Sequence, residues 1–448
     1  MRYTPHTTED ISRMLALIGA GSVDDLFGSI SREVQQAAGD PDLPEPLSEM
    51  EAAGLIETIA RSNYDPDSIA SFLGGGAYDH YVPAAVGQLI SRSEFYTSYT
   101  PYQAEVSQGT LQAIYEYQSL ICRLTGLEIA NASGYDGASV TADAALMACS
   151  ITGRDTVLVS GTVNPAYRTV VQTYCSSSER RVVSVPPSDG VTDSGRALEQ
   201  VLDERAACLI VQNPNFLGNL ENLAALGAMA KKCGALFVVV CDPVGLGVLA
   251  APGEAGADIA VGEGQALGIP LSYGGPYLGF FATRERYKRR LPGRIVGKTE
   301  DNRGRTGYVL TLQTREQHIR REKATSNICT NQALVALAAT IYMALMGKEG
   351  FRRLAELCLQ KAHYLAGRIA ELPGFSLAYP EQPFFREFAI NTPRPPGEII
   401  ERMLQKRFLA GIDLGSVDET LEGKLLIAVT ERRTRAQMDA FIQALAKM

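Results

Sequence analysis

Few residues in this sequence are of the types that build metal or redox centres. The 448 residues include four histidines, which lie far apart, and eight cysteines, none of which forms a Cys-x-x-Cys pair. A zinc or redox site needs clustered thiolates or imidazoles, so we expect no metal site. We interpret the cysteines as small buried side chains of a protein that stays in a reducing compartment, the cytoplasm.

The sequence also lacks an excess of positive charge and any long apolar run. It has 42 lysines and arginines against 50 aspartates and glutamates, which gives a formal net charge of −8. Proteins that bind nucleic acid usually present a basic surface, so we expect no nucleic-acid partner. No stretch of about 18 apolar residues is free of charges and helix breakers, which argues against a membrane span. Residues 1–10 carry an acidic pair where a secretory signal needs an apolar run, so secretion is not expected.

Hydropathy patterns divide the chain into three parts. Residues 1–70 contain helical stretches and no strand pattern, and a first helix is expected to begin with Thr8 as its cap and to end at Gly19. We interpret this part as a helical N-terminal arm. In residues 71–310, short apolar strands alternate with helices, which is typical of a mostly parallel sheet covered on both faces. The expected strands lie at 156–160, 181–185, 208–212, 236–241, 259–261 and 277–283.

The predicted fold class is therefore α/β, with a large α/β/α domain at residues 71–310 followed by a smaller domain. A polar, arginine-rich connector is expected at 284–323. Residues 311–448 are predicted to form a smaller C-terminal α+β domain. Its helices are expected near 331–347 and 350–371, and its strands near 375–380, 385–391 and 424–430.

An acidic residue directly follows the most apolar strand pattern. The run at 236–241 ends in Asp242-Pro243, at the carboxyl end of a predicted parallel strand, where ligands of α/β sheets bind. A buried carboxylate at that place needs a cation or hydrogen-bond donors. One such cation is the protonated pyridine nitrogen of pyridoxal phosphate (PLP). Alternatively, Asp242 only opens a turn before Pro243, and the sequence favours neither interpretation.

The same region of the sequence contains no lysine. None occurs between Lys232 and Lys288, a window that includes Asp242 and all the following strand ends up to the predicted strand at 277–283. PLP chemistry uses a lysine amine as the group that forms an imine with the cofactor. The chain therefore has no nucleophile of that kind where a cofactor would be expected.

Four segments carry a resemblance to a known family. They are Tyr99–Gly109, Leu124–Gly137, Gly262–Gln265 together with Gly274-Gly275-Pro276, and Gln313–Thr330, which is the most specific. Through them the chain resembles the glycine cleavage system P-protein, and specifically the N-terminal (alpha) subunit of organisms in which glycine dehydrogenase (decarboxylating) is split into two chains. The resemblance extends over nearly the whole sequence.

This resemblance implies a PLP-dependent transferase fold of type I (aspartate-aminotransferase-like) and an α2β2 complex with a beta subunit. The family enzyme decarboxylates glycine on PLP and transfers the aminomethyl group to the lipoyl arm of H-protein. The beta subunit carries the cofactor lysine. Two alternatives stay open. In one, Lys298 or Lys323 of this chain forms the imine; in the other, the chain is a free-standing binding or regulatory protein derived from a PLP enzyme.

The family's motifs also imply that this chain lacks the groups that hold the cofactor. Gln265 takes the position of the Schiff-base lysine, or Ala266 does if the match is shifted by one residue. Gly161 stands where beta subunits have a histidine that stacks on the cofactor ring. We therefore interpret Asp242 and Gln265 as vestiges. No catalytic residue is expected here, and PLP is expected to be bound by the beta subunit.

Two stretches are candidates for reaching the partner's active site, because enzymes of this fold build their sites at subunit interfaces. They are the rings of Tyr96, Tyr99 and Tyr102, and the polar groups of Ser326, Asn327 and Thr330. The tyrosines could instead belong to the chain's own core, and Ser326 and Thr330 could cap a helix that starts near residue 331. His80 and His318 receive no role, because a lone histidine is usually structural.

Overall fold

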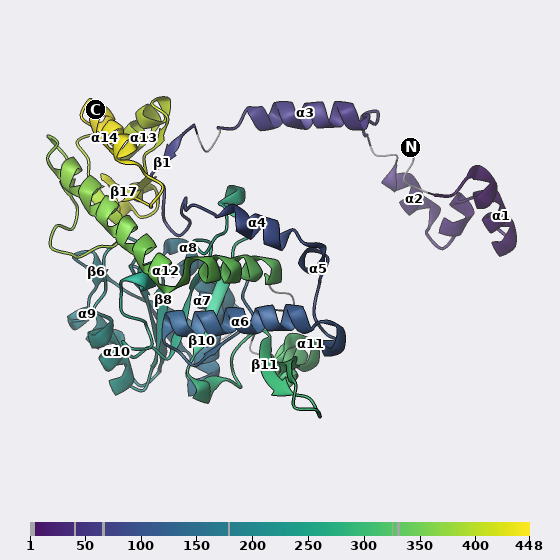
Figure 1. Ribbon diagram of the computed structural model, residues 1–448, viewed down its shortest axis with the longest axis horizontal. Coiled ribbons are helices and arrows are strands. Elements are labelled where there is room, and N and C mark those ends of the chain that lie inside the picture. Colours follow the sequence, from purple (N-terminus) through teal and green to yellow (C-terminus); the bar gives the residue numbers. More distant parts are fainter. Residues whose placement is uncertain (1–4, 40–41, 65–67, 178–179, 325, 329–331) are drawn as a thin grey trace. The chain divides into compact units, whose positions relative to one another are not determined.

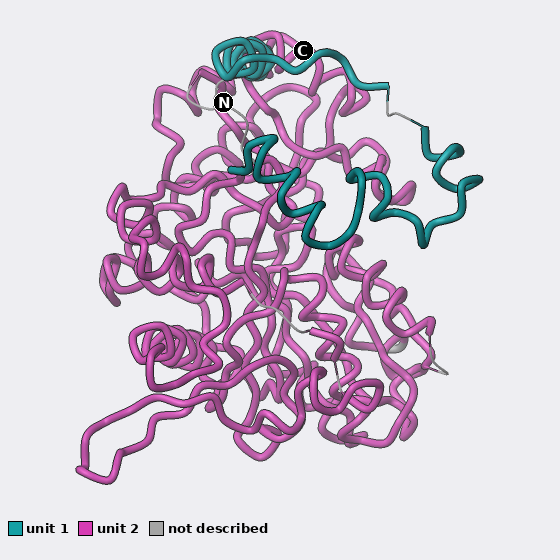
Figure 2. The backbone as a smooth tube through the Cα atoms, turned by 90° about the vertical axis from the view of Figure 1, so that its right-hand side faces the viewer, with its two compact units in different colours: residues 1–65 teal, residues 66–448 magenta. Residues whose placement is uncertain are grey.

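The chain divides into two compact units, residues 1–65 and residues 66–448, which Figure 2 shows in different colours. The computed structural model describes residues 5–39, 42–64, 68–177, 180–324, 326–328 and 332–448. The domain boundaries expected at 70/71 and 310/311 stay predictions.

The first unit is made of short helices. It contains α1 (Thr8–Ile18), α2 (Arg32–Ala38), α3 (Glu49–Arg61) and a 3₁₀ turn at Asp24–Phe27, and none of the described residues in these elements is buried. The cap of α1 is Thr7 and not Thr8. The Thr7 hydroxyl accepts a hydrogen bond from the Asp10 N–H at 3.2 Å, and the Asp10 carboxylate accepts one from the Thr7 N–H at 3.0 Å. This reciprocal pair explains the shift by one residue.

A seven-stranded sheet forms the centre of the second unit (Figure 1). Its strands, in sheet order, are β2 (Ile129–Ala130), β10 (Gly279–Thr283), β9 (Ile259–Glu263), β8 (Leu236–Cys241), β7 (Ala206–Asn213), β3 (Thr156–Ser160) and β4 (Arg181–Val185). Strands β9, β8, β7, β3 and β4 are parallel, and β10 is antiparallel to both β9 and β2. The prediction of a mostly parallel sheet is confirmed.

Helices cover both faces of this sheet. They are α6 (Gln108–Thr125), α7 (Gly137–Thr152), α8 (Pro165–Ser176), α9 (Arg196–Val201) and α10 (Leu223–Lys232). Alternate residues of β8 enter two different cores. Phe237 and Val239 pack in the core that includes α6 and α10, whereas Val238 and Val240 pack in the core that includes α7 and α8. Burial on both faces explains why the strand is a continuous apolar run.

The C-terminal part builds a second, smaller sheet. Helix α12 (Ala333–Ala370) leads into it and is interrupted at Gly347, whose φ of 58° is not helical, so the two expected helices follow each other end to end. In sheet order the strands are β13 (Ser376–Leu377), β14 (Glu387–Asn391), β17 (Lys424–Ala428) and β16 (Ile412–Asp413). Two further helices, α13 (Pro396–Gln405) and α14 (Arg435–Leu445), pack with this sheet in one core.

Several short elements lie outside the predicted pattern. The segment at 284–323 is not only a connector, because it contains the antiparallel hairpin of β11 (Ile295–Glu300) and β12 (Thr306–Thr311). Strand β1 (Ala70–Ser71) pairs with β15 (Phe408–Leu409). The remaining short elements are β5 (Pro187–Ser188), β6 (Val191–Thr192), α4 (Ala84–Ile90), α5 (Ser93–Tyr96) and α11 (Gln317–Arg320).

Helix α12 is long and apolar enough, by length and composition alone, to cross a membrane, and it is the one helix in the described part of the chain that is. Its residues Ala336, Ala339 and Tyr342 are buried in the core that α6 also enters. The helix therefore packs as a core helix of the second unit, and its apolar character follows from that burial.

Candidate functional site

The carboxyl ends of strands β8 and β9 form one polar pocket. Strand β8 is followed directly by Asp242, and its parallel neighbour β9 ends at Glu263, two residues before Gln265. Ligands of open α/β sheets bind at this edge. Residues that line the pocket include Tyr78, Asn164, Tyr167, Asp242, Glu263 and Arg386, and the cavity volume between them is about 30 Å³.

Gln265 is buried, and both polar atoms of its side-chain amide have partners on the backbone. Its Nε2 donates hydrogen bonds to the carbonyl oxygens of Tyr78 at 3.0 Å and Ile269 at 2.7 Å, and its Oε1 accepts one from the Tyr78 N–H at 2.8 Å. An amide cannot form an imine, and this amide is fully used in holding the segment around Tyr78. Ala266, the other residue that the motif match allows, is also buried and has no functional group.

Asp242 has a cation and a backbone donor as partners. Its Oδ2 is 2.6 Å from Nη2 of Arg386, and its Oδ1 accepts a hydrogen bond from the Val244 N–H at 2.9 Å. Asp242 therefore opens a turn, as the second interpretation predicts, and its charge is matched by a cation, as a buried carboxylate requires. The cation is a side chain of the same protein.

The guanidinium of Arg386 lies over the ring of Tyr78, and both side chains line the pocket. The guanidinium carbon of Arg386, the residue before β14, lies 3.4 Å from the centre of the Tyr78 ring. The Tyr78 hydroxyl donates to Oε2 of Glu387 at 2.7 Å, and Oε1 of Glu387 accepts from the Gly75 N–H at 2.7 Å. The glycine-rich segment that contains Gly75 and Tyr78 is therefore joined to Glu387 of β14 by two hydrogen bonds.

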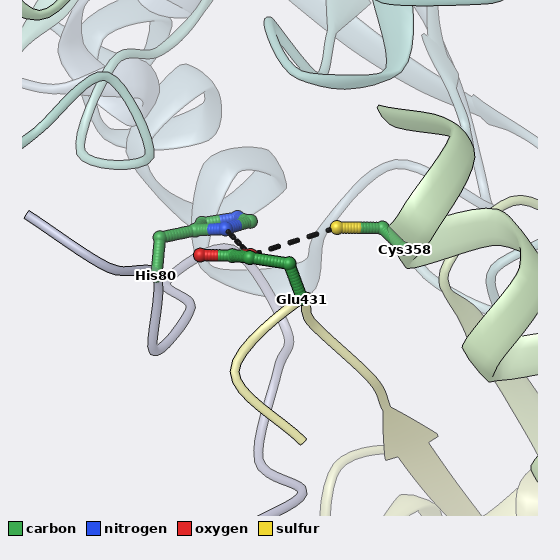
Figure 3. A group of neighbouring side chains, drawn as sticks. All are labelled: His80, Cys358 and Glu431. Atoms are coloured by element: carbon green, nitrogen blue, oxygen red, sulfur yellow. Dashed lines mark hydrogen bonds and ion pairs between the residues drawn. The ribbon is translucent and has the colours of Figure 1, made fainter. Parts of the chain in front are cut away.

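His80, Glu431 and Cys358 form a buried cluster beside Arg386 (Figure 3). Their potential ligand atoms lie within 4.8 Å of one another, close enough for a metal ion. His80 Nδ1 is 2.6 Å from Oε2 of Glu431, and its Nε2 contacts the guanidinium of Arg386. Because a guanidinium only donates, Nε2 is the acceptor, and the ring proton is on Nδ1 and is shared with Glu431.

The protonation states of this cluster favour a hydrogen-bond network over a metal site. Burial raises the pKa of Cys358 to about 12, so its thiol keeps the proton and donates to Glu431 at 3.7 Å. Burial is the largest single influence on the pKa of Glu431 and raises it, but the interactions with His80 and the hydrogen bonds from backbone N–H groups together outweigh burial, and the pKa falls to about 2. Glu431 is an anion with donors on both sides, and the cation next to His80 is Arg386. We interpret the cluster as the support of Arg386.

Helix α7 begins beside the pocket, and its N-terminal N–H groups already have anionic partners. Helix N-termini are natural sites for phosphate. Here the Asp136 carboxylate accepts a hydrogen bond from the Ser139 N–H at 2.7 Å, and the Glu263 carboxylate accepts one from the Gly137 N–H at 2.9 Å. Burial raises the pKa of Glu263 to about 7, although hydrogen bonds from the N–H groups of Leu278, Gly137 and Gln265 lower it.

The residues of this pocket do not fit PLP. The cofactor's aldehyde would meet the amide of Gln265, and its pyridine nitrogen would meet Asp242 already paired with Arg386. Its phosphate would meet the carboxylate of Glu263 at the start of α7. Gly161, at the position expected for a stacking histidine, has no side chain to offer. That Asp242 and Gln265 are vestiges stays a prediction, but each now has a defined partner.

Several residues in and beside the pocket were not expected from the sequence. Tyr78, Glu263 and Arg386 line the pocket, and His80, for which no role was predicted, contacts Arg386. One signal was available, because Arg386-Glu387 places two charges inside the apolar run that predicts a strand at 385–391. Charges within a buried strand usually have partners or a function.

The tyrosines at 96, 99 and 102 lie on the surface. Their exposed fractions are 68%, 76% and 56%, so the alternative that they belong to the chain's own core is wrong. The Tyr102 hydroxyl accepts a hydrogen bond from buried Arg294 at 3.2 Å, which fixes this ring. Large exposed rings with a hydroxyl are typical of protein interfaces. Their contact with a partner's active site stays a prediction.

The second candidate stretch lies beside α7. Ser326 is partly buried, accepts a hydrogen bond from the Ile328 N–H at 3.2 Å and contacts Asp143, whose pKa burial raises to about 7. Asn327 is exposed. The cap of α12 is Gln332, without a side-chain hydrogen bond, so Ser326 does not cap this helix. Thr330 lies outside the described residues.

Sequence comparisons match the chain along its whole length. The profile of the glycine cleavage system P-protein covers residues 1–445. A protein of Chlorobium limicola named probable glycine dehydrogenase (decarboxylating) subunit 1 is 54% identical over 448 residues, which are 100% of both chains. A protein of the same name from Moorella thermoacetica is 52% identical over 445 residues, which are 99% of both chains.

Solved structures match it as well. The crystal structure of a glycine decarboxylase (P-protein) of the glycine cleavage system, in inhibitor-bound form, has a TM-score of 0.92 and 44% identity over 100% of both chains. A glutamate decarboxylase of Lactobacillus brevis has a TM-score of 0.67 at 14% identity, over 94% of this chain and 96% of that one, which shows the fold alone. The expected PLP-dependent transferase fold of type I is confirmed. The chain belongs to the glycine cleavage system P-protein family.

Proposed function

We propose that this chain is one subunit of a two-chain glycine dehydrogenase (decarboxylating) and that it does not bind PLP itself. The cofactor is bound by a beta subunit of related fold. The observation that carries the proposal is Gln265. It stands where the family's cofactor lysine is expected, and its amide is used up by the backbone of Tyr78 and Ile269. The relatives named subunit 1 support the division into two chains.

In this proposal, decarboxylation of glycine and transfer of the aminomethyl group to the lipoyl arm of H-protein take place at the beta subunit. PLP bound there supplies the electron sink for the reaction. This chain contributes a surface, in which Tyr96, Tyr99 and Tyr102 offer rigid rings to the partner. An α2β2 assembly located in the cytoplasm is the arrangement that we expect.

The test compares the isolated chain with the chain co-expressed with its beta subunit. We expect PLP absorbance and exchange of the glycine carboxyl group with bicarbonate only in the complex. PLP absorbance or exchange activity of the isolated chain would contradict the proposal.

A lysine elsewhere in this chain is a poor alternative. Lys298 is on β11 and Lys323 follows α11, and neither is among the described residues that line the pocket of Asp242. Borohydride reduction of the complex followed by peptide mapping decides the point, because it attaches the cofactor permanently to the lysine that holds it. We expect the label on the beta subunit; a label on Lys298 or Lys323 would contradict this.

A free-standing regulatory protein is the other alternative, and the full-length match to enzyme subunits does not favour it. Affinity purification of this chain at its natural expression level provides the check. We expect the beta subunit to be recovered with it in equal amounts, whereas recovery of the chain alone would favour the alternative.

A further inference from the structure

Arg386 is the largest fully buried side chain among the described residues, and it lies in the pocket where a cofactor is expected. Its Nη2 is 2.6 Å from Oδ2 of Asp242, and both side chains are shielded from water, with exposed fractions of 1% and 11%. The flat guanidinium lies 3.4 Å from the centre of the Tyr78 ring. A planar cation is thus held between a carboxylate at a strand end and an aromatic face.

A second set of groups holds the guanidinium from the other side. Its Nη1 contacts Nε2 of His80, whose Nδ1 is 2.6 Å from Oε2 of Glu431. The other oxygen of Glu431 accepts a hydrogen bond from the Tyr81 N–H at 2.7 Å. Glu431, His80, Arg386 and Asp242 therefore form one continuous series of polar contacts that ends in the pocket at Asp242, with anions at both ends. Such an arrangement fixes the position of the cation between them.

We propose that Arg386 is an internal substitute for the protonated pyridine ring of PLP, and that by pairing with Asp242 it excludes the cofactor from this chain. A buried carboxylate needs a cation, and Arg386 provides the one that a cofactor would otherwise provide. The inference goes beyond the proposed function, which requires only that the chain lack a lysine. The missing lysine amine and the presence of Arg386 are two separate obstacles to PLP binding.

The experiment introduces a lysine amine at residue 265, with Arg386 either present or replaced. It uses three full-length variants, Gln265→Lys, Gln265→Lys/Arg386→Met and Gln265→Lys/Arg433→Met. Arg433 is the matched control, because it is also buried and forms an ion pair, at 2.7 Å, but with Asp79. Each variant is incubated with pyridoxal and reduced with borohydride, and the pyridoxyl group on residue 265 is measured by peptide mapping. Pyridoxal has no phosphate, so the carboxylates at the start of α7 do not affect the result.

We expect residue 265 of the Arg386 double variant to be labelled at least about tenfold more than that of the single variant or of the Arg433 control, a change of about 1.4 kcal/mol in affinity. Equal labelling of the three variants overturns the proposal, and so does a folded Arg386 double variant that stays unlabelled. PLP bound by the unaltered chain is a different result, which overturns the proposed function.

A second measurement needs neither a ligand nor a change at residue 265. Melting temperatures are compared for Asp242→Asn, Arg386→Met and the variant with both changes. If the two side chains stabilise each other's burial, each single change lowers the melting temperature, and the double change lowers it by less than the sum. Additive losses would show that the pair is not coupled and would overturn the proposal.

Discussion

The strand-end pocket and the surface that carries Tyr96, Tyr99 and Tyr102 use their polar groups in opposite ways. Arg386 in the pocket and Gln265 just after β9 are buried and bonded to other parts of the same chain. On the tyrosine surface, the three rings are more than half exposed. This difference is what we expect if the first region has lost its ligand and the second has kept its partner. Substitutions in each region test whether the two regions differ in this way.

The largest effect on stability is expected for Arg386→Met. It leaves the carboxylate of Asp242 buried without its cation, which costs about 3–5 kcal/mol in the free energy of unfolding. Urea titration of the isolated chain measures it. Arg353→Met is the matched control, because Arg353 pairs with Glu356 at 3.4 Å on an exposed face of α12, where such a pair contributes about 0–1 kcal/mol. Equal losses would mean that burial makes the pair of Arg386 and Asp242 no more important for stability than the exposed pair of Arg353 and Glu356.

Gln265→Leu is expected to have the next largest effect. The substitution keeps the volume but leaves the N–H and C=O of Tyr78 and the C=O of Ile269 buried without partners, a loss of about 2–4 kcal/mol. Gln112→Leu is the control, because the amide of Gln112 donates only to Glu116 on the surface, and a change within about 0.5 kcal/mol is expected. The same urea titration serves both. If Gln265→Leu is as mild as its control, the amide does not hold the pocket closed.

Glu263→Gln is expected to change the pH dependence of stability. Burial raises the folded-state pKa of Glu263 from 4.5 to about 7, so over that range the folded chain keeps a proton that the unfolded chain has released. Stability from this group is fully present below pH 4.5 and is lost as the pH rises through 7. The variant removes this loss, on the order of 1–3 kcal/mol.

The measurement is the free energy of unfolding between about pH 5 and 8, in the unaltered chain and in the variant. Asp143, whose pKa burial also raises to about 7, contributes equally to both proteins and cancels in the difference. Glu254→Gln, on the exposed surface, is the control and should leave the profile as it is. Parallel profiles for Glu263→Gln and the unaltered chain would refute the assignment.

The smallest effect on the isolated chain is expected for Tyr96→Ala, within about 0.5 kcal/mol, because the ring is 68% exposed. Affinity for the beta subunit should behave differently and fall by about 2 kcal/mol or more, the loss that marks an interface hot spot, a class enriched in tyrosine. Titration calorimetry with the beta subunit measures it. Tyr273→Ala, which removes another exposed ring, should leave the affinity unchanged. If both changes weaken binding equally, the tyrosine surface has no special role.

How far the fold could be predicted depended on burial. Strand β8 (Leu236–Cys241) was predictable to the residue, because it is an apolar run buried on both faces and followed by Asp-Pro. The hairpin of β11 and β12 was not, because most of its residues are partly exposed and show no alternation. Part of its stability comes from a helix side chain. The amide of Gln118 bonds to both the N–H and the C=O of Val296, a contact that no local pattern indicates.

The candidate site was predictable in what it lacks and in Asp242 at the end of β8, but not in the partners of Asp242. The absence of a lysine is a property of a bounded stretch of sequence and can be established by reading it. The presence of Arg386 beside Asp242 cannot, because it depends on packing between the two sheets. His80 and Arg386, for example, are 306 positions apart. Local patterns identify strands and caps, whereas partners of buried charges are chosen by the tertiary structure.

The amide of Gln265 and the guanidinium of Arg386 also determine what the stability of this chain depends on. A ligand that binds only the folded state adds a stabilisation that grows with the logarithm of its concentration. If this chain binds no PLP, as we propose, these two side chains supply the contacts from within, and folding gains no such stabilisation from the cofactor. The expected result is a subunit that stays folded when PLP is scarce and remains able to bind a beta subunit that later takes up the cofactor.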